Sequence, residues 1–215
     1  MRPRLLDLFC GAGGAAMGYH RAGFDVVGVD NRPQPNYPFR FVQLDALDFP
    51  LDGFDAVHAS PPCQHWTRSA NAHEWPDLIT PLRPLLERAE LPYVIENVPR
   101  APLVAPFVLC GSAFGLRVRR HRAFETNFGV MVPPCAHDGH DFVTVAGGGP
   151  NPASFHRGLG ATGGPDRKPR NVADALDALG VDWKMTRAEA NEAIPPAYTE
   201  HIGGYLLAQL VEAPA

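Results

Sequence analysis

Short apolar runs alternate with polar segments that contain glycine and proline along most of the chain. A short apolar run bounded by turn residues is typical of a buried strand. These runs predict strands at about residues 4–9, 25–29, 40–44, 55–59, 93–96 and 119–126. Helices are expected between several of them, so the predicted fold class is α/β, with a mostly parallel sheet and helices on both faces.

Helical patterns lie between these runs. Residues 15–22 form a helical stretch that Gly23 can cap. Around residues 78–86 the apolar spacing is also helical, but Pro81 and Pro84 should confine a regular helix to the part after them or impose a kink.

Two further helices are expected late in the sequence. Thr186 and Glu189 have the spacing of a capping box, which predicts a short helix that Pro195 ends. Residues 197–211 are predicted to form a helix despite two adjacent glycines. Residues 129–183, in contrast, contain several glycine and proline pairs and predict an irregular region.

Length and composition indicate one compact folded unit. A chain of 215 residues with 45% hydrophobic content can bury one sizeable core, so we expect one domain with a small appendage. The sequence has no run of 18 or more apolar residues and no charged and then apolar leader, so neither a membrane span nor a secretory signal is predicted. Four scattered cysteines predict free thiols in a cytoplasmic protein.

The net charge of −4 does not by itself predict a nucleic-acid-binding protein, because phosphate affinity usually comes from clustered lysines and arginines. Local clusters exist, however. They are Arg117, Arg119, Arg120 and Arg122, and further along Arg157, Arg167, Lys168 and Arg170. The first cluster alternates with apolar residues as a strand would, so some of its arginines should face inward or line a cleft. The second is either a solvated face or a surface for phosphates.

A cysteine follows the fourth apolar run. Pro61, Pro62, Cys63 and Gln64 stand directly after residues 54–60. Ligands of open α/β sheets bind at the carboxyl ends of the strands, so this thiol is placed for chemistry. Taken alone, Cys63 is either a nucleophile or a small buried hydrophobic residue.

A glycine-rich turn follows the first apolar run. Strand, glycine-rich turn and helix together let a nucleotide-like ligand approach the backbone and a helix N-terminus. Asp30 ends the second run, about 20 residues later, where a carboxylate can accept hydrogen bonds from ribose hydroxyls. The residues of the first strand end and the turn are Asp7, Leu8, Phe9, Cys10, Gly11, Ala12, Gly13 and Gly14.

Taken in order, these motifs resemble those of the DNA cytosine-5 methyltransferase family. The matching segments are 7–14 (the first S-adenosylmethionine motif), 62–64 (the Pro-Cys-Gln nucleophile motif), 96–98 (the Glu-Asn-Val motif), 120–122 (the paired-arginine motif) and 193–203 (the last motif). The resemblance extends from about Leu5 to about Leu207, with a poorly matched middle. It implies a Rossmann-like S-adenosylmethionine-dependent methyltransferase fold in which the last motif folds back beside the first.

The resemblance implies S-adenosyl-L-methionine as the cofactor. Asp30 matches the acidic residue at the ribose and Asp45 the residue that contacts the adenine, while Phe9 packs either on the adenine or in the core. The implied cofactor-binding residues are Asp7, Phe9, Cys10, Gly11, Ala12, Gly13, Gly14, Asp30, Asn31, Asp45, Ala46 and Pro62.

The resemblance also implies covalent catalysis on a cytosine. Cys63 is the implied nucleophile at C6, Glu96 the residue at N3, and Arg122 the residue at O2, with Arg120 in support. The target base cannot be reached inside a duplex, so DNA is the implied partner and the base is expected to flip out of the helix. Family habit suggests a restriction-modification or phage context.

Residues 1–128 and 184–215 are therefore expected to form the catalytic methyltransferase domain, and residues 129–183 a reduced target-recognition region. Residues 64–75 have the length and polarity of a mobile lid, in which Trp66 and Trp75 serve either as wedges or as anchors.

The sequence departs from the family pattern at several places. Val118 stands where the arginine motif usually begins with Gln, Asn191 and Glu192 replace the usual Gly-Asn pair, and Asn31 replaces a bulky residue at the adenine. These departures leave alternatives open: an RNA acceptor, a modified methyl donor, or an inactive DNA-binding relative. A plain dinucleotide-binding oxidoreductase would leave the Cys63 and Glu96 motifs unexplained.

Cys135, His137 and His140 raise the question of zinc. This segment lacks a second cysteine-rich pair at metal-ligand spacing. The sequence therefore favours a polar loop there, and no metal is predicted.

Overall fold

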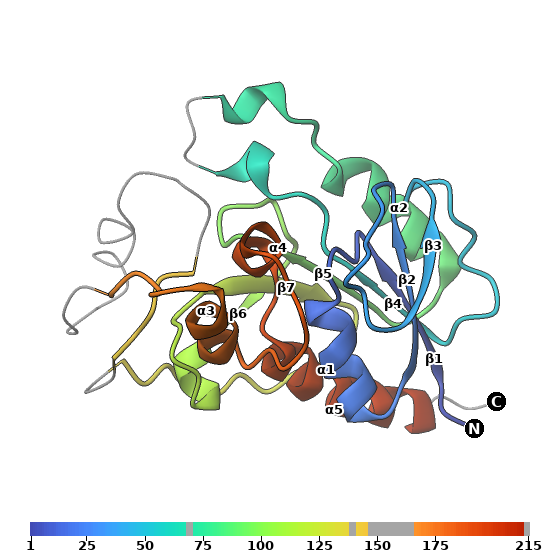
Figure 1. Cartoon of the computed structure of the whole chain (residues 1–215). Helices are drawn as coiled ribbons and strands as arrows, with labels where there is room; N and C mark the ends of the chain where they lie inside the picture. Colours follow the sequence, from blue (N-terminus) through green and yellow to red (C-terminus); the bar gives the residue numbers. More distant parts are fainter. Residues whose placement is uncertain (68–70, 138–140, 146–165, 213–215) are drawn as a thin grey trace.

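The computed structural model describes residues 1–67, 71–137, 141–145 and 166–212, without the side chain of Glu212. Its strands form one sheet in the order β3-β2-β1-β4-β5-β7-β6 (Figure 1). The strands are β1 (Arg4–Leu8), β2 (Asp25–Asp30), β3 (Arg40–Gln43), β4 (Ala56–Ala59), β5 (Tyr93–Asn97), β6 (Phe107–Leu109) and β7 (Arg122–Thr126).

Most of the sheet is parallel. Strands β3, β2, β1, β4 and β5 run in one direction, whereas β7 is antiparallel to both β5 and β6. The chain proceeds from β1 outward through β2 and β3, and then returns to β4 on the other side of β1. Open α/β sheets bind ligands at the carboxyl ends of the strands where the direction reverses in this way. The predicted fold class is confirmed.

Helices cover both faces of the sheet, as predicted. The helices are α1 (Gly14–Ala22), α2 (Ile79–Ala89), α3 (Val172–Leu179), α4 (Arg187–Glu192) and α5 (Pro196–Glu212), with 3-10 turns η1 (Gln64–Trp66), η2 (Ala72–Glu74) and η3 (Gly111–Phe114). Successive strand residues point to opposite faces. Leu5 accordingly packs in the hydrophobic cluster of α1 and α5, whereas Leu6 packs with Leu82 and Leu86 of α2.

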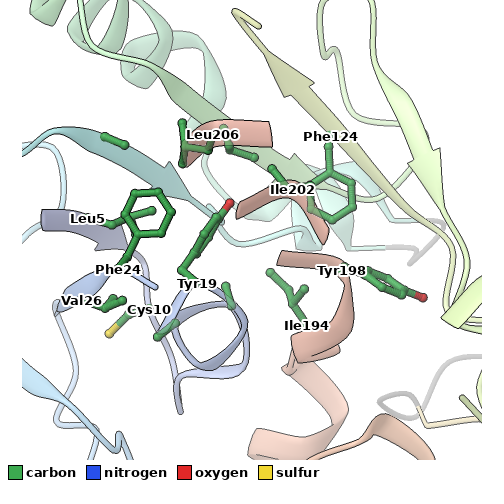
Figure 2. Close-up of a cluster of buried hydrophobic side chains, with 14 of the residues drawn as sticks. Leu5, Cys10, Tyr19, Phe24, Val26, Phe124, Ile194, Tyr198, Ile202 and Leu206 are labelled. Atoms are coloured by element: carbon green, nitrogen blue, oxygen red, sulfur yellow. The ribbon is translucent and has the colours of Figure 1, made fainter. Parts of the chain in front are cut away.

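Glycines let α5 lie against the backbone of α1. A side chain at Gly18 would overlap the hydroxyl of Thr199 and the backbone of Pro196, and one at Gly203 would overlap Ala22. The Thr199 hydroxyl instead donates a 2.8 Å hydrogen bond to the carbonyl of Ala15. This close approach builds the cluster of Figure 2 around residues of both helices.

The segment before α5 lies beside the glycine-rich turn. A Cβ at Gly14 would overlap the backbone of Ile194, which belongs to the last matched motif. The indole of Trp183 donates a 3.0 Å hydrogen bond to the carbonyl of Ala12. The expectation that the last motif lies beside the first is therefore confirmed.

Several predicted element boundaries were wrong. The strand expected at 119–126 begins only at Arg122, because Arg119 and the residues around it turn and bind other segments. Helix α2 begins before Pro81, which lies in the first turn, where backbone N–H groups have no helical acceptor anyway. Pro84 lies inside the helix and removes one hydrogen bond. Strand β6 and helix α3 were not predicted.

The described part of residues 129–183 packs on the sheet domain. Helix α3 contributes Ala175 and Leu179 to a hydrophobic cluster that also contains Ala12 of the glycine-rich turn and Ala190 of α4. Over the residues described, the expected recognition region thus shares a hydrophobic core with the glycine-rich turn and α4.

Among the helices of the described residues, none combines the length and the apolar character needed to cross a membrane.

We expect Gly18→Ala to destabilise the fold by about 1–3 kcal/mol, because its methyl group must push α5 away from α1. Gly204→Ala is the matched control, since Gly204 is an exposed helical glycine with open space around it. The control should be neutral or stabilising by up to about 1 kcal/mol. Urea unfolding of both variants measures the difference, and equal effects would contradict the packing argument.

Candidate active site

Cys63 begins a loop that is tied to the neighbouring strand. It is the residue before η1, and its carbonyl accepts a 3.0 Å hydrogen bond from the N–H of Trp66. The buried Asn97 side chain at the end of β5 donates a 2.9 Å hydrogen bond to the carbonyl of Pro61. This bond holds the Pro61-Pro62-Cys63 segment at the carboxyl edge of the sheet. Pro62 itself is exposed.

An ion pair joins β5 to β7 at the same edge. Arg122 Nε lies 3.1 Å from Glu96 Oε1, and the Glu96 side chain is 7% exposed. The antiparallel register sets Asn97 opposite Ala123, so Arg122 starts β7 just where β5 ends. Arg122 Nη1 also donates a 2.9 Å hydrogen bond to the carbonyl of His121.

Burial and charge act on Glu96 and Cys63 together. Burial raises the pKa of the Glu96 carboxyl above its usual range, while Arg122, Arg120 and a hydrogen bond with Ser60 act in the opposite direction. Burial likewise raises the pKa of the Cys63 thiol, and the charge of Arg122 lowers it. Burial therefore favours the neutral forms of both groups, and the arginine charge opposes this effect at each of them.

A series of buried hydrogen bonds leads from Tyr19 through His58 and Ser60 to Glu96. The Tyr19 hydroxyl lies 2.9 Å from His58 Nδ1, and His58 Nε2 lies 2.6 Å from the Ser60 hydroxyl. Burial lowers the pKa of His58 to about 3, so the imidazole is neutral at physiological pH. This series orients the Ser60 hydroxyl that bonds to Glu96.

Arg120 is bound to backbone rather than to the ion pair. Its guanidinium donates hydrogen bonds of 2.5 Å to the carbonyl of Val145 and 2.7 Å to that of Asn191. The backbone of Arg120 has a positive φ of 31°, and its carbonyl accepts a 2.8 Å hydrogen bond from the Tyr198 hydroxyl of α5. Burial and the neighbouring Arg122 lower the pKa of Arg120 to about 9, which leaves it protonated at neutral pH.

Other arginines of the two clusters pair with carboxylates inside the chain. Arg119 is buried, as expected for part of the first cluster, and lies 3.4 Å from Asp166. Arg117 and Arg167 both pair with Asp174. These arginines are therefore partly neutralised within the fold. Arg157 lies outside the described residues.

The glycine-rich turn adopts a left-handed backbone. Phe9, Gly11 and Gly13 have φ values of 58°, 49° and 85°. The N–H of Gly11 donates a 3.1 Å hydrogen bond to Asp30 Oδ2, which joins the turn to the end of β2. A Cβ at Gly11 would meet nothing within 4 Å, so the turn leaves open space beside its backbone. Cys10 is buried beneath it.

The carboxyl ends of β2 and β3 lie together. The N–H of Leu44 donates a 3.1 Å hydrogen bond to the carbonyl of Asp30, which brings the exposed Asp45 beside it. Ala46 is buried and lines a hollow with Leu8 and Leu82. The side chain of Asn31 is exposed.

Asp7 and a tyrosine missed by the sequence analysis form a buried pair under the turn. The Tyr37 hydroxyl donates a 3.5 Å hydrogen bond to Asp7 Oδ2, and burial raises the pKa of Asp7 well above its usual range. Asp7 is completely buried, so its side chain faces Tyr37 rather than the surface. Gly28 was the available signal, because a side chain there would overlap the Tyr37 ring and glycine within a strand often marks such an approach.

The expected lid is described except for residues 68–70, so Arg68 lies outside the described residues. His65 Nδ1 lies 2.5 Å from the carbonyl of Trp75, which joins η1 to the end of η2. Trp75 is 38% exposed and Trp66 is half-buried. The two ends of the described part are therefore hydrogen-bonded to each other. Figure 1 shows this part projecting beyond the carboxyl edge of the sheet.

We expect wild type to lose stability relative to Glu96→Gln as pH rises. The pKa of Glu96 is raised above its ordinary value of 4.5 in the folded state. Stability from this group is therefore fully present below pH 4.5 and is lost as pH rises through the folded pKa, whereas glutamine cannot ionise.

Urea unfolding between about pH 5 and about pH 8 measures this trend. Glu87→Gln, on the exposed side of α2, is the control and should show no comparable trend. A difference for Glu96→Gln that is constant or falls with pH would contradict the burial argument.

No protein-family model matches the chain. A stretch of 78 residues is 30% identical to the type II methyltransferase M.FnuDI of Fusobacterium nucleatum. That match covers 32% of this chain and spans only 23% of the length of the relative.

Solved structures resemble the chain over nearly its whole length. A candidate DNA modification methyltransferase encoded within an E. coli prophage has a TM-score of 0.64 at 16% identity, covering 98% of this chain and 100% of that one. The Dnmt2 methyltransferase of S. pombe has a TM-score of 0.62 at 13% identity, covering 97% of this chain and 99% of that one. The chain therefore has the Rossmann-like fold of the S-adenosylmethionine-dependent methyltransferases.

Proposed function

We propose that this chain is an S-adenosylmethionine-dependent DNA (cytosine-5)-methyltransferase that acts through a covalent bond between Cys63 and C6 of a flipped-out cytosine. The observation that carries the proposal is the Glu96–Arg122 ion pair of 3.1 Å, at the strand ends beside the Cys63 loop. Thiol, carboxyl and guanidinium are the three groups that attack on a cytosine ring requires. The matched stretch of the type II methyltransferase M.FnuDI supports the same reaction class.

The glycine-rich turn fits the proposed cofactor. The open space beside Gly11 lets a ligand reach the backbone there, and Asp30 already orients the turn through the Gly11 N–H. The Asp30 carboxylate would accept hydrogen bonds from the ribose hydroxyls, and Asp45 would lie at the adenine. Phe9 is half-buried and packs against the hydrophobic cluster that contains Ala46.

Bound S-adenosylmethionine supplies an electrophilic methyl group on its sulfonium. Cys63 would pass its thiol proton to water and form a bond from Sγ to C6 of cytosine, which pushes electron density into the ring and makes C5 nucleophilic. C5 would then take the methyl group as the bond between that methyl group and the sulfonium sulfur breaks, which leaves S-adenosylhomocysteine. Loss of the C5 proton would follow, and elimination would break the bond between Sγ and C6. We assign the C5 proton to a water molecule, since no side chain is identified as the base.

Glu96 and Arg122 would balance the charge that attack creates. A Glu96 carboxyl with a raised pKa can donate a hydrogen bond to N3 as electron density moves there. Arg122 would stabilise O2 while its bond to the His121 carbonyl fixes its direction. Arg120, held by Val145 and Asn191, would position the segment rather than touch the base.

DNA is the proposed acceptor, with residues 64–75 as the lid over a flipped base and residues 129–183 as a reduced target-recognition region. The prophage-encoded neighbour favours DNA. RNA is the competing acceptor that the sequence leaves open, so the experiment must include both substrates.

We expect Cys63→Ala to abolish 5-methyldeoxycytidine formation and to leave binding of S-adenosylmethionine nearly unchanged, because the thiol acts after the cofactor has bound. Nucleoside mass spectrometry of unmethylated DNA and of structured RNA, incubated with cofactor and either protein, measures the product. DNA containing 5-fluorocytosine should trap wild type covalently, since C5 then has no proton to lose.

Each outcome decides a separate part of the proposal. Methylated RNA without methylated DNA would move the acceptor to RNA. Turnover by Cys63→Ala above a few per cent of wild type would contradict the assignment of the nucleophile. Bound cofactor with neither product nor trapped adduct would favour a non-catalytic DNA-binding protein.

Arg122→Lys should slow the methyl-transfer step by about 10²-fold, because one ammonium cannot bind Glu96 and the His121 carbonyl in the geometry of a guanidinium. Arg88→Lys, on the exposed surface of α2, is the control and should leave the rate unchanged. Single-turnover kinetics separates this effect from product release. An unaltered single-turnover rate would remove Arg122 from the mechanism.

A further inference from the structure

Four side chains of the kinds that bind metals lie close together beside β6 and β7, at one edge of the sheet. They are Cys110, His121, Cys135 and His137, and their ligand atoms all lie within 4.8 Å of one another. None of the four is part of the thiol, carboxyl and guanidinium set at Cys63. We propose that they bind one structural Zn²⁺ ion.

The sheet register explains how distant residues come together. Strands β6 and β7 are antiparallel neighbours in which Leu109 lies opposite Arg122 (Figure 1). One step beyond that pair, Cys110 follows β6 and His121 precedes β7, so the two residues lie opposite each other with their ligand atoms close together. Cys135 and His137 then arrive from the segment after β7, at a spacing of two residues that lets both reach one ion.

The distances match a tetrahedral zinc site. Cys110 Sγ lies 3.2 Å from His137 Nε2, and Cys135 Sγ lies 3.6 Å from His121 Nε2. Zinc bond lengths of about 2.3 Å to sulfur and about 2.0–2.1 Å to nitrogen place sulfur and nitrogen ligands roughly 3.5 Å apart in a tetrahedron. One ring nitrogen of His121 and one of His137 lie within 4.8 Å of each other and of both sulfur atoms.

The donor set favours zinc over other ions. Two thiolates and two imidazoles are a common structural zinc set, and they are poor ligands for magnesium or calcium, which prefer oxygen. Two thiolate charges balance the charge of Zn²⁺, which suits a site whose Cys110 and His121 are 1% and 6% exposed. Four protein ligands leave no open position, as in structural rather than catalytic sites.

Outer hydrogen bonds support the same arrangement. The Ser112 hydroxyl lies 3.0 Å from Cys110 Sγ and accepts a 3.1 Å hydrogen bond from the N–H of Ala136. Ser112 therefore links the buried cysteine to the backbone between Cys135 and His137. Such contacts orient metal ligands in known sites.

The ion would hold the paired-arginine segment in place. His121 lies between Arg120 and Arg122, and its carbonyl accepts the hydrogen bond from Arg122 Nη1. A metal bond to the His121 ring would thus fix the backbone from which Arg122 reaches Glu96. The zinc site stands independently of the proposed function, and only this consequence for Arg122 rests on it.

Metal analysis of the full chain, purified without chelators or a histidine tag, tests the proposal. We expect about one zinc per chain in wild type, and less than about one tenth in Cys135→Ser and in His137→Asn. Both residues lie partly at the surface, so these variants are better suited than changes of the buried Cys110. Cys63→Ser is the matched thiol control and should keep its zinc.

Cobalt binding gives a second readout that does not depend on activity. Co²⁺ added to the metal-free protein should give the intense visible absorption of a tetrahedral cobalt–thiolate site, and Cys135→Ser should lose it. Zinc content equal in wild type and Cys135→Ser would overturn the proposal. The proposal would also be overturned if metal-free wild type bound no cobalt under reducing conditions. A Cys110–Cys135 disulfide detected by mass spectrometry instead of bound metal would overturn it as well.

Discussion

Helix α5 can lie against α1 only because Gly18 and Gly203 carry no side chains. From that contact the Tyr198 hydroxyl reaches the carbonyls of Arg119 and Arg120, while Ile194 lies on Gly14. The N-terminal end of α5 therefore holds the segment that leads into Arg122. The residues just before α5 pack on the glycine-rich turn. A single helix pair sets the distance between the two halves of the proposed reaction centre.

The second constraint is the burial of charge at the carboxyl edge. Glu96 is placed where desolvation opposes its ionisation, and Arg122 only partly offsets that effect. Arg120 adds a second positive charge nearby, and the Ser60 hydroxyl, which is hydrogen-bonded to the neutral His58, adds a hydrogen bond to Glu96. Such an arrangement lowers folding stability above the ordinary pKa of the carboxyl and gives Glu96 a raised pKa.

The sequence predicted the parallel strands and their motifs well, because each motif is local. The alternation of apolar runs located β1, β2 and β4, and the capping box at Thr186 and Glu189 is present as predicted. The short strand β6 was missed, and the start of the proline-containing helix α2 was predicted wrongly. β6 has only three residues, and tertiary packing lets α2 continue through Pro84.

The metal-binding cluster shows the same limit most clearly. Cys135 and His137 were noticed as neighbours in sequence, but Cys110 and His121 join them only through the β6–β7 register. That register depends on a strand that the sequence did not predict. Tyr37 was missed for a similar reason, since only the folded chain places it over Gly28.

The contact between α1 and α5 also has a consequence for synthesis on the ribosome. The two helices are separated by more than three quarters of the printed sequence. Synthesis proceeds at roughly 5–20 residues per second, so the apolar side of α1 remains without α5 for on the order of ten seconds or more. During that interval Tyr19 and its neighbours are exposed to solvent and accessible to chaperones, so folding yield depends on how the nascent chain is protected.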